Sequence, residues 1–155
     1  MKTAKTVRSF LFVVVGMLIM ISLVQATKPP CQNHKIEATG VGQLLGEDNT
    51  FEQISDGGLL QGTRTGHLEC IDCSSFPVLT FSAAVTFTSH LGTLTVFSTG
   101  TFDNSTGAYS LSGTVTGATG RLAGASGTLT FEGVADSNGT FVEVITGNIC
   151  VNLRP

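Results

Sequence analysis

The stretch Gly117-Ala-Thr-Gly-Arg-Leu-Ala-Gly-Ala-Ser-Gly127, followed directly by Thr128-Leu-Thr-Phe131, decides how this chain can fold. It holds four glycines and one cation, Arg121, and it separates two segments in which apolar and polar residues alternate. Alternation with a period of two is typical of β-strands that bury one face, and glycine permits the backbone conformations of tight turns. The stretch therefore predicts a turn between two neighbouring strands.

The same pattern continues along the rest of the chain, where no sustained helical period of apolar residues occurs. Turns are expected at Asp103-Asn-Ser-Thr-Gly107 and at Asp136-Ser-Asn-Gly139, because Asn-Gly is a strong hairpin signal. Regularly spaced turns in an all-β chain indicate a sandwich or a barrel. Strands are expected at Lys35–Leu44, Leu59–Cys70, Leu79–Thr88, Gly92–Phe102, Ala108–Thr116, Thr128–Ala135 and Thr140–Val151, with Glu47–Ser55 as the candidate for one more.

The N-terminus has the three-part layout of a secretory signal peptide. Three cations precede an uncharged apolar run from Phe10 to Val24, and Val24-Gln25-Ala26 supplies small residues at the positions that signal peptidase reads. We expect cleavage after Ala26, which makes residues 1–26 the signal peptide and residues 27–155 one secreted domain, extracellular or periplasmic. A retained anchor is the alternative, although the run is shorter than the roughly 20 residues that span a bilayer.

The charge of the mature chain restricts its partners. Without the three signal cations, five Lys and Arg remain against eleven Asp and Glu, so the net charge is 5 − 11 = −6. The five cations are scattered along the chain rather than clustered. This argues against nucleic acid and against anionic membrane surfaces as partners.

Four cysteines in an exported chain favour disulfides. Three pairings are open. Cys31 lies just before the first expected strand and Cys150 near the end of the last. In an up-and-down sheet that closes on itself with an even number of strands, these two positions are neighbours. We therefore predict Cys31–Cys150 as a clasp across the seam, which leaves Cys70–Cys73 as the second pair.

The glycine-rich turn also resembles a family. Thr119-Gly-Arg-Leu122, the glycines and alanines after it, and a final strand that ends Thr146-Gly-Asn-Ile-Cys150 resemble the C-terminal half of the dirigent and allene oxide cyclase-like barrels, over about residues 79–150. The family usually has an aromatic residue where Leu122 stands here. The resemblance implies an eight-stranded antiparallel up-and-down barrel, often trimeric, with an apolar lumen.

The resemblance also implies two kinds of activity, because relatives cyclise an unstable fatty-acid epoxide or steer the coupling of phenoxy radicals. Neither activity uses a cofactor, so none is expected here. No residue of this chain matches the acidic and polar residues that those relatives use in the lumen, and no catalytic residue is carried over.

Two glutamates are the candidates for acid–base chemistry. A two-residue turn at Asn138-Gly139 places Glu132 opposite Ile145 and Glu143 opposite Val134, which puts both carboxylates on one face. If that face lines a lumen, desolvation raises at least one carboxyl pKa and an acid–base pair results. The alternative is that both glutamates face solvent and the other face forms the core. That other face carries Leu129, Phe131, Val142 and Val144.

Arg121 and Tyr109 are the candidates for ligand binding. Arg121 binds an anion in the glycine-rich turn, or else it pairs with an acid such as Glu132 or caps backbone carbonyls. Tyr109, the only tyrosine, alternates with Leu111 and Val115, so packing in the core is its default role.

Two further motifs have an alternative interpretation. His67-x-x-Cys70-x-x-Cys73 has spacing that suits a metal such as zinc, although export favours a disulfide, and we expect no metal site. Asn104-Ser-Thr106 and Asn138-Gly-Thr140 fit the N-glycosylation pattern, which matters only in a eukaryotic source.

Two classes of function follow from these patterns. The first, which we favour, is a secreted, non-catalytic barrel that holds a small apolar ligand or serves as a stable module. The second is a cofactor-free cyclase, isomerase or dirigent-type protein that acts on a reactive apolar substrate. An adhesion role, based on the Thr- and Ser-rich surface, is a third. The polar content of the lumen distinguishes the first two, because converging ionisable groups favour catalysis.

Overall fold

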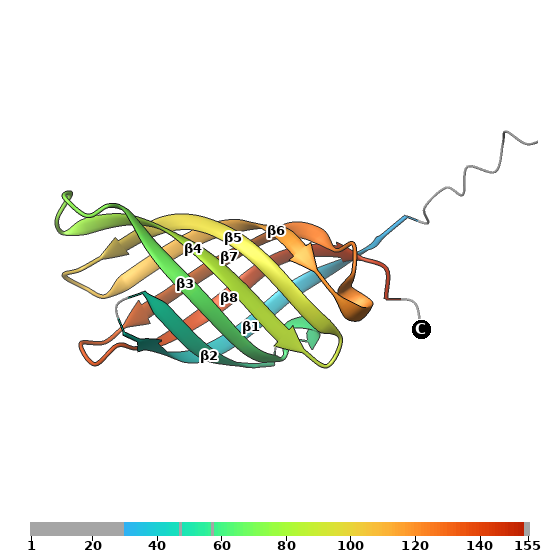
Figure 1. The fold of residues 1–155 in the computed structure, drawn as a ribbon. Helices are drawn as coiled ribbons and strands as arrows, with labels where there is room; N and C mark the ends of the chain where they lie inside the picture. Colours follow the sequence, from blue (N-terminus) through green and yellow to red (C-terminus); the bar gives the residue numbers. More distant parts are fainter. Residues whose placement is uncertain (1–29, 47, 57, 154–155) are drawn as a thin grey trace, which may run out of the picture.

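The computed structural model describes residues 30–46, 48–56 and 58–153. They form a closed antiparallel barrel of eight strands, in which β1 also pairs with β8 (Figure 1). The strands are β1 (Gln32–Leu45), β2 (Asn49–Ser55), β3 (Gly62–Asp72), β4 (Val78–Ser89), β5 (Gly92–Asp103), β6 (Ala108–Ala118), β7 (Ser126–Ala135) and β8 (Thr140–Val151). The predicted all-β barrel is confirmed, and Glu47–Ser55 does contain a strand. The signal peptide expected at residues 1–26 lies outside the described residues.

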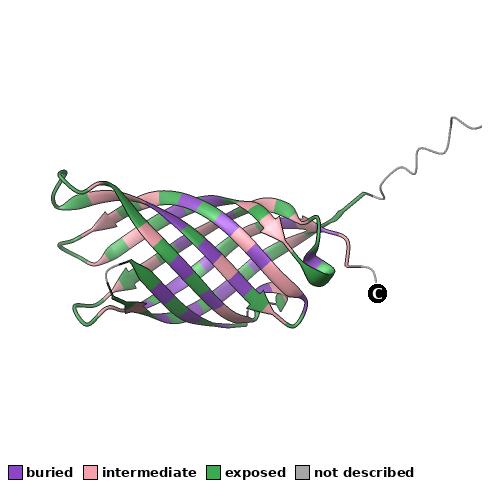
Figure 2. Ribbon diagram, viewed as in Figure 1, coloured by how far each residue is buried: buried purple, intermediate pink, exposed green. Residues whose placement is uncertain are grey.

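Period-two alternation divides the side chains of each strand between the lumen and the outer surface of the barrel. Buried and exposed residues alternate along the strands, and the pattern continues from strand to strand around the barrel (Figure 2). Inward side chains fill the lumen, while outward ones meet solvent. No helix in the described part of the chain has the length and apolar character needed to cross a bilayer.

The seam between the first and last strands is long and is locked by a disulfide. β1 pairs with β8 from Gln32↔Val151 to Gln43↔Thr140 without a register shift. Cys31 and Cys150 are bonded to each other, with their Cα atoms 5.4 Å apart. The predicted clasp is therefore present. A second disulfide joins Cys70 to Cys73, and both are consistent with an oxidising, extracellular environment.

One strand begins later than the sequence predicts. Leu59 and Leu60 do not belong to β3 but to the 3-10 helix η1 (Gly58–Leu60), and β3 starts at Gly62. Asp56, directly after β2, has a φ of +53°, and this left-handed conformation ends the extended backbone of the strand. The turn buries Leu60 completely at one end of the barrel. Alternation of apolar residues cannot reveal such a plug, because an apolar pair fits both structures.

The two ends of the barrel differ. One end carries both chain ends, η1 and a second 3-10 helix, η2 (Gly120–Leu122), and its lumen is filled by apolar side chains such as Leu91 and Leu122. We call it the plugged end. The opposite end carries the β1–β2, β3–β4, β5–β6 and β7–β8 turns, and we call it the mouth (Figure 1). The core therefore occupies one half of the lumen, and the other half is left for a site.

The β7–β8 turn is one residue longer than a two-residue hairpin. The Asp136 amide donates to the carbonyl of Thr140, and the Asp136 carboxylate accepts from the amides of Asn138 and Thr140. Gly139 takes the left-handed conformation that this loop requires, with a φ of +79°. The register therefore shifts by one, and a one-residue shift exchanges the two faces of a strand.

Candidate functional site: a buried ion cluster below an open cavity

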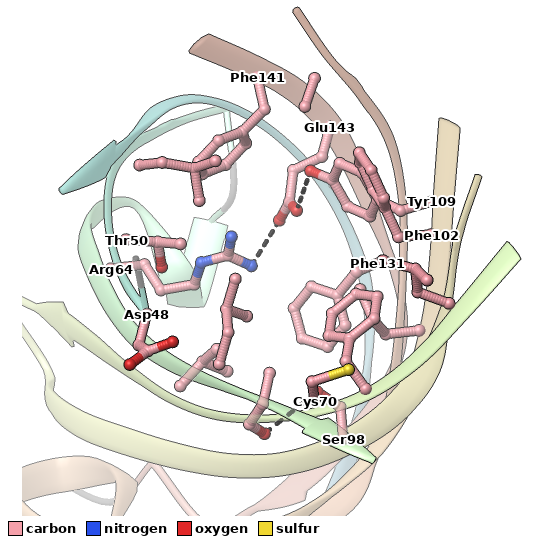
Figure 3. A pocket seen from close by; sticks show the side chains of 18 of the residues that line it. Asp48, Thr50, Arg64, Cys70, Ser98, Phe102, Tyr109, Phe131, Phe141 and Glu143 are labelled. Carbon is pink, nitrogen blue, oxygen red and sulfur yellow. Dashed lines mark hydrogen bonds and ion pairs between the residues drawn. The ribbon is translucent and has the colours of Figure 1, made fainter. Parts of the chain in front are cut away.

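The mouth leads into a cavity of about 300 Å³ inside the barrel (Figure 3). Near the opening it is lined by residues beside the mouth turns, among them Leu44, Asp48 and the disulfide Cys70–Cys73. Further in, apolar and aromatic side chains such as Phe131 form the wall. A volume of this size is at the lower end of the range for small-molecule sites.

Three charged side chains meet at the inner part of this cavity. Arg64 Nη1 donates to Glu143 Oε1 over 2.5 Å, and Arg64 Nε lies 2.7 Å from Glu52 Oε2. All three side chains are buried, and Glu52 is 0% exposed. Arg64 and Glu143 line the cavity, whereas Glu52 lies behind them. We call Glu52, Arg64 and Glu143 the ion cluster.

The sheet register brings the cluster together. Glu52 on β2 is the direct cross-strand partner of Arg64 on β3, and Glu143 on β8 is the partner of Gly40 on β1. Gly40 makes this packing feasible, because a Cβ at that position would overlap the Glu52 carboxylate. With no side chain in the way, Arg64 reaches over β2 and β1 to the carboxylate on β8.

Aromatic rings surround the Arg64 guanidinium. Its central carbon lies 5.3 Å from the ring centre of Phe131, 5.8 Å from that of Phe87 and 5.9 Å from that of Phe141. Cations over aromatic faces at such distances are attracted to the ring electrons. The rings also exclude water, which strengthens the ion pairs but makes any unpaired charge costly.

Tyr109 extends the cluster on the cavity side. Its hydroxyl donates to Glu143 Oε2 over 2.8 Å, so both oxygens of that carboxylate accept a hydrogen bond (Figure 3). The phenol crosses β7 at Gly133, where a Cβ would overlap the ring. Glu143 thus links a cationic donor and a phenolic donor at the floor of an otherwise apolar cavity.

Burial controls the protonation of the cluster. Burial, together with a smaller contribution from the nearby Glu143, raises the pKa of the Glu52 carboxyl from its ordinary 4.5 to about 8, against the attraction of Arg64. Arg64 Nε does not point its hydrogen at Glu52, and neither oxygen of Glu52 completes a hydrogen bond. The ionised form of Glu52 is therefore not stabilised by any well-aligned hydrogen bond among the described residues. Burial first, and Glu143 second, raise the pKa of Tyr109 well above its ordinary 10, which keeps the phenol protonated.

The structure separates the two glutamates that the sequence placed on one face. Glu132 pairs with Val144 and is exposed, whereas Glu143 pairs with Gly133 and is buried. The predicted diagonal pair is wrong, because the longer β7–β8 turn shifts the register by one. The alternative in which both face solvent is wrong for Glu143 as well. The inward residues combine the two faces that were expected, and they are Leu129, Phe131, Phe141, Glu143, Ile145 and Ile149.

The two ligand-binding candidates lie at opposite ends of the barrel. Tyr109 lines the cavity, in contact with the ion cluster, and is not merely packed in the core. Arg121 lies in η2 at the plugged end, is exposed, and donates from Nη2 to the carbonyl of Leu153. This contact corresponds to the carbonyl-capping alternative, and it leaves Arg121 far from the cavity.

The metal alternative for His67-x-x-Cys70-x-x-Cys73 does not fit the structure. The two thiols are bonded to each other, and His67 Nδ1 lies 3.3 Å from the side-chain oxygen of Asn49. Within the described residues, no group of three or more His, Cys, Asp or Glu side chains is placed to hold a metal ion. Asn104 and Asn138 are exposed in two of the mouth turns, and their glycosylation stays a prediction.

Sequence reasoning missed Glu52 and Arg64, the other two members of the cluster. A signal was present on β2, because Glu52 has the same parity as the apolar Ile54. The neighbouring Phe51 hid it by suggesting that the opposite face is buried, whereas Phe51 is 41% exposed. On β3 the inward positions include Arg64 and a glycine, which give no apolar pattern to recognise.

Comparison of the chain with protein-family models, with curated proteins and with solved structures found no match.

Proposed function

We propose that this protein is an exported barrel that binds a small, mainly apolar molecule in the mouth half of its lumen. The observation that carries the proposal is the cavity of about 300 Å³, which opens at the mouth and ends at the ion cluster. A lumen that served only as a rigid core would be filled with side chains along its whole length, as it is at the plugged end. Apolar walls with a few polar groups at one place are typical of small-molecule sites.

A matched pair of alanines on β4 tests this proposal. Ala83 is buried and lines the cavity, while its neighbour Ala84 points outward and is exposed. We expect the neutral dye N-phenyl-1-naphthylamine to bind the wild-type protein with a saturable rise in fluorescence. Ala83→Phe should abolish this rise by filling the cavity, and Ala84→Phe should leave it unchanged. Equal binding by both variants, each shown to be folded by circular dichroism, would contradict lumenal binding.

A cofactor-free enzyme is the second candidate, and the link between Glu143, Arg64 and Tyr109 supports it. A carboxylate that faces an apolar cavity beside two donors can remove a proton from a carbon next to a carbonyl, while Arg64 stabilises the negative charge that moves to the oxygen. The resemblance to dirigent and allene oxide cyclase-like barrels stays a prediction that points to the same class.

Deuterium exchange tests the enzyme candidate without a known substrate. In D₂O, an active cluster should speed the exchange of the methyl protons of 2-acetonaphthone, followed by proton NMR. Glu143→Gln should abolish the acceleration, and Glu132→Gln, on the outer face, should preserve it. Exchange at the rate of buffer alone would leave the binding protein as the proposal.

The trimer implied by the family resemblance stays a prediction. Outward valines on three adjacent strands give it a surface, because Val41 pairs with Val142 and Val142 pairs with Val134. Each of these side chains is about half exposed, which is unusual for an apolar row on a solvated face. We expect native mass spectrometry without reduction to report the subunit number, and a Val142→Lys variant to be monomeric.

A further inference from the structure

We propose that the ligand is a neutral molecule with an apolar, ring-bearing body, and that its inner end carries an oxygen that accepts a hydrogen bond from Arg64. This inference rests on the proposed function and names the class of ligand.

At pH 7 the charges of the floor are balanced, because the raised pKa of Glu52 keeps that carboxyl protonated and the charge of Arg64 is paired with that of Glu143. Arg64 is the one described cation that lines the cavity, and it is held by Glu143 in front and Glu52 behind. An anionic ligand would bring a second negative charge next to that of Glu143, in surroundings with little water to screen it. A cationic ligand would have to compete with Arg64 for a carboxylate whose two oxygens both accept a hydrogen bond. A neutral ligand leaves this balance intact.

On the cavity side of the floor, the free hydrogen-bonding group is a donor, because the unpaired oxygens of Glu52 do not line the cavity. Arg64 Nη1 donates to Glu143, Nε lies 2.7 Å from Glu52 without completing a hydrogen bond, and no partner of Nη2 is found among the described residues. The Tyr109 proton is already donated to Glu143. A ligand therefore gains most by presenting an acceptor, such as a carbonyl or ether oxygen, to Nη2.

The remaining walls fit a ring. Phe102 and Phe131 face the cavity (Figure 3). Phe81 and aliphatic side chains such as Leu111 also line it. Aromatic side chains pack against flat rings in stacked or edge-on arrangements, and they add little polarity. The body of the ligand is therefore expected to be apolar and planar in part.

Four naphthalene probes of nearly equal size separate the possibilities. They are the ketone 2-acetonaphthone, the hydrocarbon 2-ethylnaphthalene, the anion 2-naphthoate and the cation 2-naphthylmethylammonium. The four dissociation constants are measured at pH 7 with the full mature chain, by displacement of N-phenyl-1-naphthylamine. We expect the ketone to bind about tenfold more tightly than the hydrocarbon, and both ions to bind more weakly than the ketone.

A variant with an apolar floor provides the control. Arg64→Met, Glu52→Leu, Glu143→Leu and Tyr109→Phe together remove every charge and hydroxyl of the cluster, a kind of replacement that cores often tolerate. We expect it to bind the ketone and the hydrocarbon equally. If it does not fold, the comparison of the four probes on the wild-type chain decides alone.

The outcomes separate the two claims. Binding of the anion, the cation or the hydrocarbon at least as tightly as the ketone would overturn the neutral-acceptor ligand and keep the binding function. Failure of all four probes and of the dye to bind would overturn the proposed function itself, and the ligand class with it. A tenfold ketone preference that persists in the apolar-floor variant would show that Arg64 is not the donor.

Discussion

The plugged end and the mouth of this barrel are built from the same alternating strands, yet they are finished differently. At the plugged end, 3-10 turns bury Leu60 and Leu122, and the disulfide Cys31–Cys150 joins the first and last strands. At the mouth, the lumen stays open, and three charged residues are buried at the inner part of the cavity. The comparison shows that one short chain can stabilise one end of the barrel by apolar packing and a disulfide. The other end can then carry buried charges, which lower the free energy of unfolding.

The largest expected difference between the two ends is in the stability that is lost when an arginine is replaced, Arg64 at the mouth or Arg121 at the plugged end. Arg64→Met leaves Glu52 and Glu143 buried without their cation, and we expect a loss of about 3–5 kcal/mol in the free energy of unfolding. Arg121→Met at the plugged end removes an exposed side chain, and its effect should stay within about 0.5 kcal/mol. Urea unfolding of both variants measures the difference. Equal losses would mean that the ion cluster has no special role in stability.

The second difference between the two ends is in how much each disulfide stabilises the barrel. The cysteines of the plugged end are 119 residues apart and those of the mouth only 3. The chain-entropy relation then assigns about 5 kcal/mol to the first bridge and about 2 kcal/mol to the second. Thermal unfolding of the Cys31→Ser/Cys150→Ser and Cys70→Ser/Cys73→Ser double variants should reproduce this order. A mouth bridge that matters more than the seam bridge would contradict it.

Glu52 gives the stability of the barrel a pH dependence between about pH 4.5 and pH 8. Because the pKa of Glu52 is raised from 4.5 to about 8 in the folded chain, protonation favours folding. Its stabilising effect is complete below pH 4.5 and is lost as the pH rises to about 8, with a slope of at most about 1.4 kcal/mol per pH unit. We expect Glu52→Gln to remove this slope and to be more stable than the wild type at pH 9. Parallel pH profiles of the two proteins would show that Glu52 stays ionised.

Replacement of Tyr109 is expected to have the smallest effect on the free energy of unfolding. Tyr109→Phe removes one hydrogen bond to Glu143 and should cost about 1–2 kcal/mol, because the other donor remains. The chain has one tyrosine and no tryptophan, so ultraviolet titration follows Tyr109 alone. Phenolate absorbance should appear only well above the ordinary pKa of 10. An ordinary titration in the folded protein would mean that the phenol is open to water.

Much of the fold was predictable because it depends on local patterns. Alternation and turn residues located seven strands and suggested the eighth, Glu47–Ser55, and the position of Cys31 and Cys150 near the ends of the expected sheet led to the seam bridge. Register was harder, because the Asp136 carboxylate closes a longer β7–β8 turn than Asn-Gly suggests. That single residue decided which of Glu132 and Glu143 faces the lumen.

The site was less predictable, because its members come from four different strands. Glu143 and Tyr109 were considered as separate candidates, and nothing near either residue in the sequence points to the other. Glu52 and Arg64 meet only through the pairing of β2 with β3. A buried ion cluster breaks the apolar pattern from which strand faces are inferred, so its residues resemble surface residues in the sequence.

The central claim is that a small molecule binds in the lumen above the ion cluster, and Tyr109 can report on it directly. A chain labelled with 3-fluorotyrosine carries one fluorine, at the floor of the cavity. On titration with N-phenyl-1-naphthylamine, we expect the single ¹⁹F resonance to shift and to saturate together with the dye fluorescence, and Ala83→Phe to abolish both changes. A resonance that stays fixed while the dye fluorescence saturates would place the bound molecule outside the lumen and contradict the claim.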